Sequence, residues 1–231
     1  PACNAIPFTE DFESANFMTN QWVTITGSQA GLGFNLSQPI ADTVSLEFTG
    51  GSTYWGLTPY NEAAAFAATM SSHHASASIC VDLSGSATPE MTCLVAMPGY
   101  FNSPYRWLRI KANGTVIADI NGNTAFTNYG INITGNVGTN MSATGQTLTF
   151  DLSAYANQSS VNITFQSSCN YGPGYSIGTY SDYVLVDDIN IRNLGACTYY
   201  SASTTTTDVD CNGNSTGIAS VSVSNGYGTD S

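Results

Sequence analysis

The chain has very little positive charge. Its 231 residues contain 4 Lys and Arg against 16 Asp and Glu, which gives a net charge of -12. Nucleic-acid binding requires cationic side chains that neutralise phosphates, and adsorption to anionic membranes requires the same charge. The composition therefore argues against both partners and leaves cations, neutral glycans and other proteins. The only cations are Arg106, Arg109, Lys111 and Arg192.

Charged residues of either sign are also scarce, at 9% of the chain against about 25% in ordinary soluble domains. Disorder does not follow, because 42% of the residues are hydrophobic and 11% are aromatic. No apolar run is long enough to span a membrane, and the sequence begins at Pro1 without a signal peptide. We expect a processed, secreted protein that is not inserted directly in a membrane.

The six cysteines form no CxxC pair, which argues against a zinc or thioredoxin-like motif. In a chain rich in Ser, Thr and Asn they indicate an oxidising, extracellular setting. Cys80 and Cys93 flank one loop almost symmetrically, so in a hairpin they would face each other and form a disulfide. Cys3 and Cys197 bracket the main body and form the next candidate pair, and Cys169 competes for either of them.

Apolar and polar residues alternate with the period of β-strands along most of the chain. Clusters of Gly, Asn, Pro and Ser separate these runs at roughly regular intervals, as in a sandwich or barrel. Asn113-Gly114 between two runs is a strong signal for a two-residue hairpin turn. We expect an all-β fold with strands at 22–26, 44–48, 76–83, 91–97, 106–111, 115–120, 147–152, 161–166, 183–186 and 189–192.

The character of the sequence changes after Cys197. Residues 199–207 are a Ser/Thr run without apolar alternation, which is typical of an extended linker. The alternation that resumes near residue 218 has the pattern of the opening of a second β module, too short to fold alone. We therefore expect a sandwich over 1–197, a linker over 198–207 and an incomplete module over 208–231.

Two acidic motifs lie near the ends of the main body, at residues 9–13 (TEDFE) and 183–191 (YVLVDDINI). Each sets carboxylates beside β-forming apolar residues. If the first and last strands lie side by side, these acids converge where a hard cation such as Ca²⁺ could bind. The alternative is that the acids only solvate the ends of strands.

Four short motifs resemble those of MAM-like and carbohydrate-binding-module-like jelly rolls of bacterial secreted proteins. They are residues 7–13 followed by Trp22, and residues 81–85, 150–155 and 186–189. The resemblance covers about residues 1–197 and implies a jelly-roll β-sandwich of two antiparallel sheets. Residues 204–231 resemble the start of the short repeat of gliding-motility adhesins (SprB-like), which implies a large, type IX-secreted surface protein.

In many such jelly rolls a structural Ca²⁺ joins the first and last strands, so the resemblance implies the same here. The motifs place Glu13 and Asp188 as the first side-chain ligands, with Asp11 and Asp187 second. Ca²⁺ takes six to eight oxygens, so backbone carbonyls and Glu47 would complete the shell.

Nothing in the sequence indicates catalysis. Residues 174–178 match the GxSxG pattern, but a nucleophile elbow requires a strand–turn–helix and a downstream His, whereas His73 and His74 lie upstream. No pair of acids stands in a recognisable acid/base context. We expect a non-catalytic extracellular domain of a large cell-surface adhesin or filament-forming protein, with other copies or domains of such a protein as partners.

The alternative function is that of a carbohydrate-binding module. Such sandwiches present aromatic rings that stack on sugars, beside polar side chains that bind the hydroxyls. Trp22, Trp55 and Trp107 fit the core better, which leaves tyrosines in loops as the candidates for binding extracellular glycans. These are Tyr171, Tyr175, Tyr180, Tyr54 and Tyr60.

Overall fold

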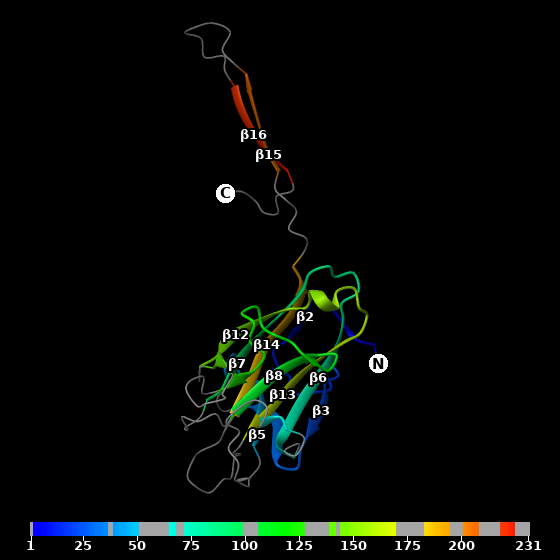
Figure 1. Cartoon of the computed structure of the whole chain (residues 1–231), viewed down its shortest axis with the longest axis vertical. Helices are drawn as coiled ribbons and strands as arrows, with labels where there is room; N and C mark the ends of the chain where they lie inside the picture. The colour runs from blue at the N-terminus through cyan, green and yellow to red at the C-terminus, as the bar shows by residue number, and fades with distance from the viewer. Residues whose placement is uncertain are drawn as a thin grey trace. The chain divides into compact units, whose positions relative to one another are not determined.

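A computed structural model shows an all-β chain that divides into two units, residues 1–194 and 195–231 (Figure 1). The first unit is a β-sandwich whose two sheets enclose one main hydrophobic core, which confirms the expected fold class. The structure describes residues 2–36, 39–50, 65–67, 72–98, 106–127, 139–141, 144–169, 183–194, 201–207 and 218–224.

One sheet of the sandwich has eight strands in the order β1-β6-β13-β8-β10-β11, with β3 also paired to β6 and β9 paired to β8. Most neighbours are antiparallel, but β1 runs parallel to β6, and β10 runs parallel to β11. The strands are β1 (Asn4–Ala5), β3 (Val23–Thr26), β6 (His74–Asp82), β8 (Arg106–Ala112), β9 (Thr115–Val116), β10 (Phe126–Thr127), β11 (Thr139–Asn140) and β13 (Val161–Cys169).

The other sheet has six strands in the order β12-β7-β14-β5-β4, with β2 also paired to β14. Its longest strand, β14, covers both of the last two runs expected from the sequence. A short 3-10 helix (Ser153–Tyr155) follows β12. The strands are β2 (Phe8–Glu10), β4 (Ala30–Asn35), β5 (Ser45–Gly50), β7 (Pro89–Ala96), β12 (Gln146–Asp151) and β14 (Tyr183–Asn193).

Alternation explains why these segments pair as they do. Along β6 the side chains of Ala75, Ala77, Ile79 and Val81 are buried, while the residues between them are partly exposed. The buried set packs against the inward face of the other sheet, because consecutive side chains of a strand point to opposite faces. The predicted Asn113-Gly114 turn joins β8 to β9, and both residues have positive φ, at 48° and 81°.

The N-terminal segment contributes to both sheets. Asn4–Ala5 lies beside β6 in the eight-stranded sheet, and Phe8–Glu10 lies beside β14 in the six-stranded sheet. The chain crosses between the two layers at the cis Ile6-Pro7 bond. The first ten residues therefore tie the two layers of the sandwich together at one end.

The second unit is a two-stranded antiparallel sheet of β15 (Ser201–Thr207) and β16 (Ile218–Ser224). Residues 198–207 were predicted as a linker, but most of this segment is strand. The Thr-rich sequence has high β propensity, and β16 offers it a partner in full register from Ser201 to Thr207.

The disulfide joins Cys3 to Cys80, with 4.7 Å between their Cα atoms, so the predicted pairs Cys80–Cys93 and Cys3–Cys197 are wrong. Cys80 and Cys93 do not lie on a hairpin, because β6 and β7 belong to different sheets. Cys93 is a buried free thiol in the core, and burial raises its pKa.

No helix in the described ranges has the length and apolar character needed to cross a bilayer.

Candidate functional site

The two acidic motifs meet in the six-stranded sheet. Strand β2 pairs with the C-terminal half of β14, where Glu10 lies opposite Ile189. Just before this point the pairing of β14 with β7 shifts register between Asp187 and Asn190, and Asp188 takes a positive φ of 46°. We name the acids gathered here, Glu13, Asp187 and Asp188, the acidic junction.

Asp187 is the buried member of the acidic junction, with 1% of its surface exposed. Its Oδ2 accepts a hydrogen bond from the Ser45 hydroxyl at 2.7 Å, and its Oδ1 accepts one from the Asp188 N–H at 2.9 Å. Burial raises the pKa of Asp187 to about 7, and the charges of Asp188 and Glu13 act in the same direction. A bound cation would relieve both effects.

Glu13 links the N-terminal segment to the residues that lead into β5. Its Oε1 accepts hydrogen bonds from the backbone N–H groups of Thr43 at 2.9 Å and Val44 at 2.8 Å. The Thr43 hydroxyl donates to Oε2, and this bond is the main reason why the pKa of Glu13 lies below its ordinary value. Ser45, the next residue, donates to Asp187, so Glu13 and Asp187 are both hydrogen-bonded to residues 43–45.

Asp11 and Glu47, the other two predicted ligands, have other hydrogen-bond partners. Asp11 is exposed and accepts a hydrogen bond from the Glu13 N–H at 3.2 Å. Glu47 accepts one from Asn35 Nδ2 at 2.5 Å, and burial raises its pKa. Within the described ranges, no three acidic, His or Cys side chains are grouped so that they could hold a metal ion. The electrostatics of Asp187 fit a cation, but side chains alone do not supply a shell, so the Ca²⁺ site stays a prediction.

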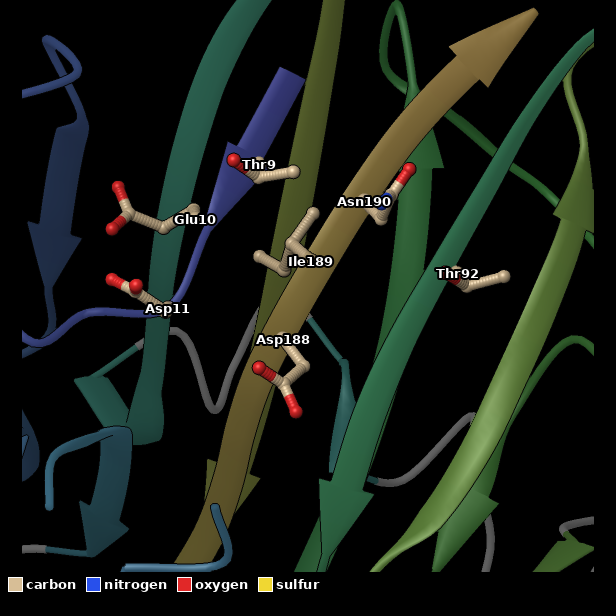
Figure 2. Close-up of a pocket in the computed structure, with 7 residues that line it drawn as sticks. All are labelled: Thr9, Glu10, Asp11, Thr92, Asp188, Ile189 and Asn190. Carbon is tan, nitrogen blue, oxygen red and sulfur yellow. The ribbon is translucent and has the colours of Figure 1, made fainter. Parts of the chain in front are cut away.

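A shallow hollow of about 290 Å³ lies beside the acidic junction. Figure 2 shows that its lining comes from the end of β2, from β14 and from β7. The hollow is mainly polar, and it brings Asp11 and Asp188 to one surface. The lining residues are Thr9, Glu10, Asp11, Thr92, Asp188, Ile189 and Asn190.

Glu10 is the one buried acid of this lining, and its contacts show a structural role. Its Oε1 accepts a hydrogen bond from the Phe12 N–H at 3.0 Å, and its Oε2 accepts from Asn20 Nδ2 and Trp22 Nε1, both at 2.8 Å. One carboxylate therefore orders the chain from β2 to Trp22. No role for Glu10 was predicted from the sequence, although a buried Trp shortly after an acidic motif requires a partner for its indole N–H.

We expect Glu10→Gln to lower the free energy of unfolding by about 1.5–3 kcal/mol, because the amide puts a donor where the carboxylate accepts hydrogen bonds from donors. Urea denaturation measures this change. Asp11→Asn, at the exposed neighbouring acid, is the matched control and should stay within about 0.5 kcal/mol of the parent. Equal stability of the two variants would show that Glu10 is not the buried acceptor described here.

A second surface lies on the outward side of the eight-stranded sheet, where rows of polar side chains cross three central strands. Ser78, Thr164 and Lys111 stand opposite one another in one row, and Ser76, Gln166 and Arg109 in the next. All six are partly exposed. We call this set the outer polar face; it consists of Ser76, Ser78, Arg109, Lys111, Thr164 and Gln166.

Hydrogen bonds across the strands order the outer polar face. The hydroxyls of Ser78 and Thr164 lie 2.8 Å apart, and Arg109 Nε donates to Gln166 Oε1 at 2.9 Å. The Arg109 guanidinium also lies over the Phe66 ring, 4.0 Å from its centroid. These contacts hold four of the six side chains, those of Ser78, Thr164, Arg109 and Gln166, in place.

The outer polar face is bordered by a buried row at one end and by an apolar edge strand at one side. In the buried row, Ser168 and Thr127 flank Trp107 in register, and both hydroxyls are buried without a hydrogen-bond partner among the residues that the structure describes. On the edge strand β3, Val23 and Ile25 are 61% and 67% exposed and lie opposite Ser78 and Ser76.

The structure bears only partly on the predicted glycan-binding residues. Trp107 and Trp22 are buried, as expected. The five candidate tyrosines (Tyr54, Tyr60, Tyr171, Tyr175 and Tyr180) and Trp55 lie outside the described residues. The outer polar face was not predicted from the sequence, although the alternation of Ser76, Ser78 and Cys80 with apolar residues indicates one outward row.

No protein-family profile matches the chain, and no curated protein matches it. Among solved structures, the chain is similar to the CBM22-1 xylan-binding domain of Paenibacillus barcinonensis Xyn10C, with 16% identity, a TM-score of 0.41, and 83% of this chain and 96% of that chain covered. It is also similar to the K1 cleaved adhesin domain of Lys-gingipain from Porphyromonas gingivalis W83, with 16% identity, a TM-score of 0.46, and 81% and 98% covered.

Proposed function

We propose that the first unit is a non-catalytic module that binds carbohydrate on the outer polar face of its eight-stranded sheet. The observation that carries the proposal is the ordered set of hydroxyl, amide and cationic groups in two aligned rows. Sugar hydroxyls both donate and accept hydrogen bonds, which Ser, Thr and Gln side chains match. Ser78 is already hydrogen-bonded to Thr164, and Arg109 to Gln166. Little side-chain entropy is therefore lost when a sugar binds.

The neighbouring residues suit the apolar parts of a sugar. Phe66 is partly exposed beside Arg109, and Val23 and Ile25 expose aliphatic surface along the other border. A pyranose presents C–H groups on its faces and hydroxyls at its rim, so a site needs both kinds of surface. The disulfide between Cys3 and Cys80 supports an extracellular setting, where glycans are the abundant polymers.

A saccharide panel tests the proposal by isothermal titration or affinity electrophoresis on the parent chain and on a matched pair of variants. Thr164→Ala removes a hydroxyl from the outer polar face, and Thr149→Ala makes the same change at a partly exposed position of the other sheet. We expect Thr164→Ala to weaken binding about 5- to 10-fold and Thr149→Ala to leave it unchanged. Absence of binding across the panel, or equal loss in both variants, would refute the proposal.

The wider context stays a prediction of the sequence. This includes membership of a large surface adhesin or filament, type IX secretion and the SprB-like repeat. A module that binds glycans is compatible with an adhesin, because attachment to a glycan-coated surface needs such a domain.

A further inference from the structure

We propose that the carbohydrate bound by the outer polar face carries negative charge, as a carboxylate or a sulfate on the sugar, and that Lys111 and Arg109 bind it. The inference rests on the proposed function and names the chemical class of its ligand. Two of the four Lys and Arg residues of the chain stand on one strand of this face, two positions apart. They point to the same side and lie roughly 7 Å apart along β8.

Arg109 is oriented as an anion-binding guanidinium would be. Its Nε donates to Gln166 Oε1, and the guanidinium lies over the Phe66 ring, so its position is fixed from two sides. A guanidinium fixed in this way binds planar carboxylate or tetrahedral sulfate oxygens with little loss of side-chain entropy. These contacts place a positive charge at a defined point of the surface.

Lys111 is a partly buried cation without an ion-pair partner in the described part of the chain. Its neighbours across the strands are Thr164 and Val116, neither of which is charged. Burial, and then the charge of Arg109, lower the pKa of Lys111. An anion bound between the two cations would remove this unfavourable interaction, so the free energy gained on binding includes its relief.

The positive potential extends along the sheet. His74 lies at the end of β6, its Nε2 is 2.7 Å from the Ala65 carbonyl oxygen, and burial is the main cause of its lowered pKa. The charges of Arg109 and Lys111 lower the pKa of His74 further. The two rows of the outer polar face contain no acidic residue, in a chain with 16 of them.

The net charge of -12 does not oppose such a ligand. At physiological ionic strength the screening length is about 8 Å, so acids elsewhere on the surface act weakly on this face. Neutral glycans were expected from the net charge of the chain, which does not show where the charged residues lie. A short saccharide needs one or two local cations, whereas nucleic acid needs a long row of them.

The test compares three oligosaccharides of equal length by isothermal titration: oligogalacturonate for the carboxylate, a sulfated oligosaccharide for the sulfate, and a neutral xylo-oligosaccharide. We expect one charged probe to bind at least about 10-fold more tightly than the neutral one, and Lys111→Gln to remove most of that preference. Arg192→Gln is the control, because it makes the same change in net charge on the other sheet, where Arg192 pairs with Glu90 at 3.1 Å.

The outcomes separate the two proposals. If all three probes bind equally, Thr164→Ala weakens them and Lys111→Gln does not, the inference about charge is wrong and the proposed function stands. If no saccharide binds, both are wrong. If Arg192→Gln reduces the preference as much as Lys111→Gln does, the preference reflects general electrostatics and the assignment to this face is overturned.

Discussion

Asp187→Asn should make the protein more stable than the parent at pH 8, and the advantage should shrink as the pH falls and disappear below pH 4. The pKa of Asp187 is raised from an ordinary 3.8 to about 7 in the folded protein. Between these values the folded state holds a proton that the unfolded chain releases. The stabilisation due to this proton is complete below pH 4 and is lost as the pH rises through 7.

The size of the expected change in stability follows from the pKa shift of Asp187. Each pKa unit corresponds to about 1.4 kcal/mol, so the parent loses at most about 4 kcal/mol between pH 4 and pH 8 through this group. Asparagine keeps an oxygen for the Asp188 N–H and places its amide against the Ser45 hydroxyl, which can accept. The variant therefore keeps both hydrogen bonds and has no charge to bury.

Urea denaturation at pH 5, 6, 7 and 8, with EGTA present, measures both proteins. We expect the parent to lose stability across this range and Asp187→Asn to change far less. Asp188→Asn is the matched control: it removes the exposed neighbouring charge and should relieve only part of the loss. Parallel pH profiles for the parent and Asp187→Asn would show that Asp187 is not the group responsible.

The same urea denaturation, repeated with Ca²⁺ in place of EGTA, tests the predicted Ca²⁺ site. At about 100 times its dissociation constant, an ion that binds only the folded state adds about 2.7 kcal/mol. A Ca²⁺ ion at the acidic junction should restore the stability of the parent at pH 8 and have little effect on Asp187→Asn. If Ca²⁺ leaves the parent unchanged, the junction is a buried acid without a metal, and the ligand set inferred from the family resemblance is wrong.

Much of the fold could be predicted because its strands follow the alternation of the core. Strand β6 illustrates this, since Ala75, Ala77, Ile79 and Val81 mark one buried face without ambiguity. Strand β4 was missed although Ala30–Asn35 alternates apolar residues with Gly and Asn, because two of its six residues are glycines, which have low β propensity. Pairing with β5 along its whole length makes this segment a strand.

The candidate sites were less predictable, because they depend on which strands become neighbours. The acidic junction was anticipated from motifs, but its buried member is Asp187 rather than Asp188, as a consequence of the register shift in β14. The pairing of Cys80 with Cys93 assumed a hairpin. Alternation already argued against it, because Cys80 shares a face with Ser78, and Cys93 shares the core face with Met91 and Val95.

Removing the disulfide in the double variant Cys3→Ala/Cys80→Ala should destabilise the first unit by about 4 kcal/mol. The two cysteines are 77 residues apart, and a cross-link that closes a loop of this length removes about that much free energy from the unfolded chain. In a domain of this size the loss corresponds to a fall in melting temperature of roughly 8–16 °C. Differential scanning calorimetry measures it directly.

The position of the Cys3–Cys80 bond indicates which part of the sandwich should lose stability first. The Cys3–Cys80 bond anchors β1 to β6, and the chain then crosses to β2, where Glu10 and Glu13 organise the acidic junction. Without the bond this end of the sandwich should open before the rest, so backbone amides of residues 4–13 should lose hydrogen-exchange protection most. Reductant should lower the parent to the level of the variant and leave the variant unchanged. A variant as stable as the parent would mean that the hydrogen bonds of Glu10 hold this end of the sandwich without the bond.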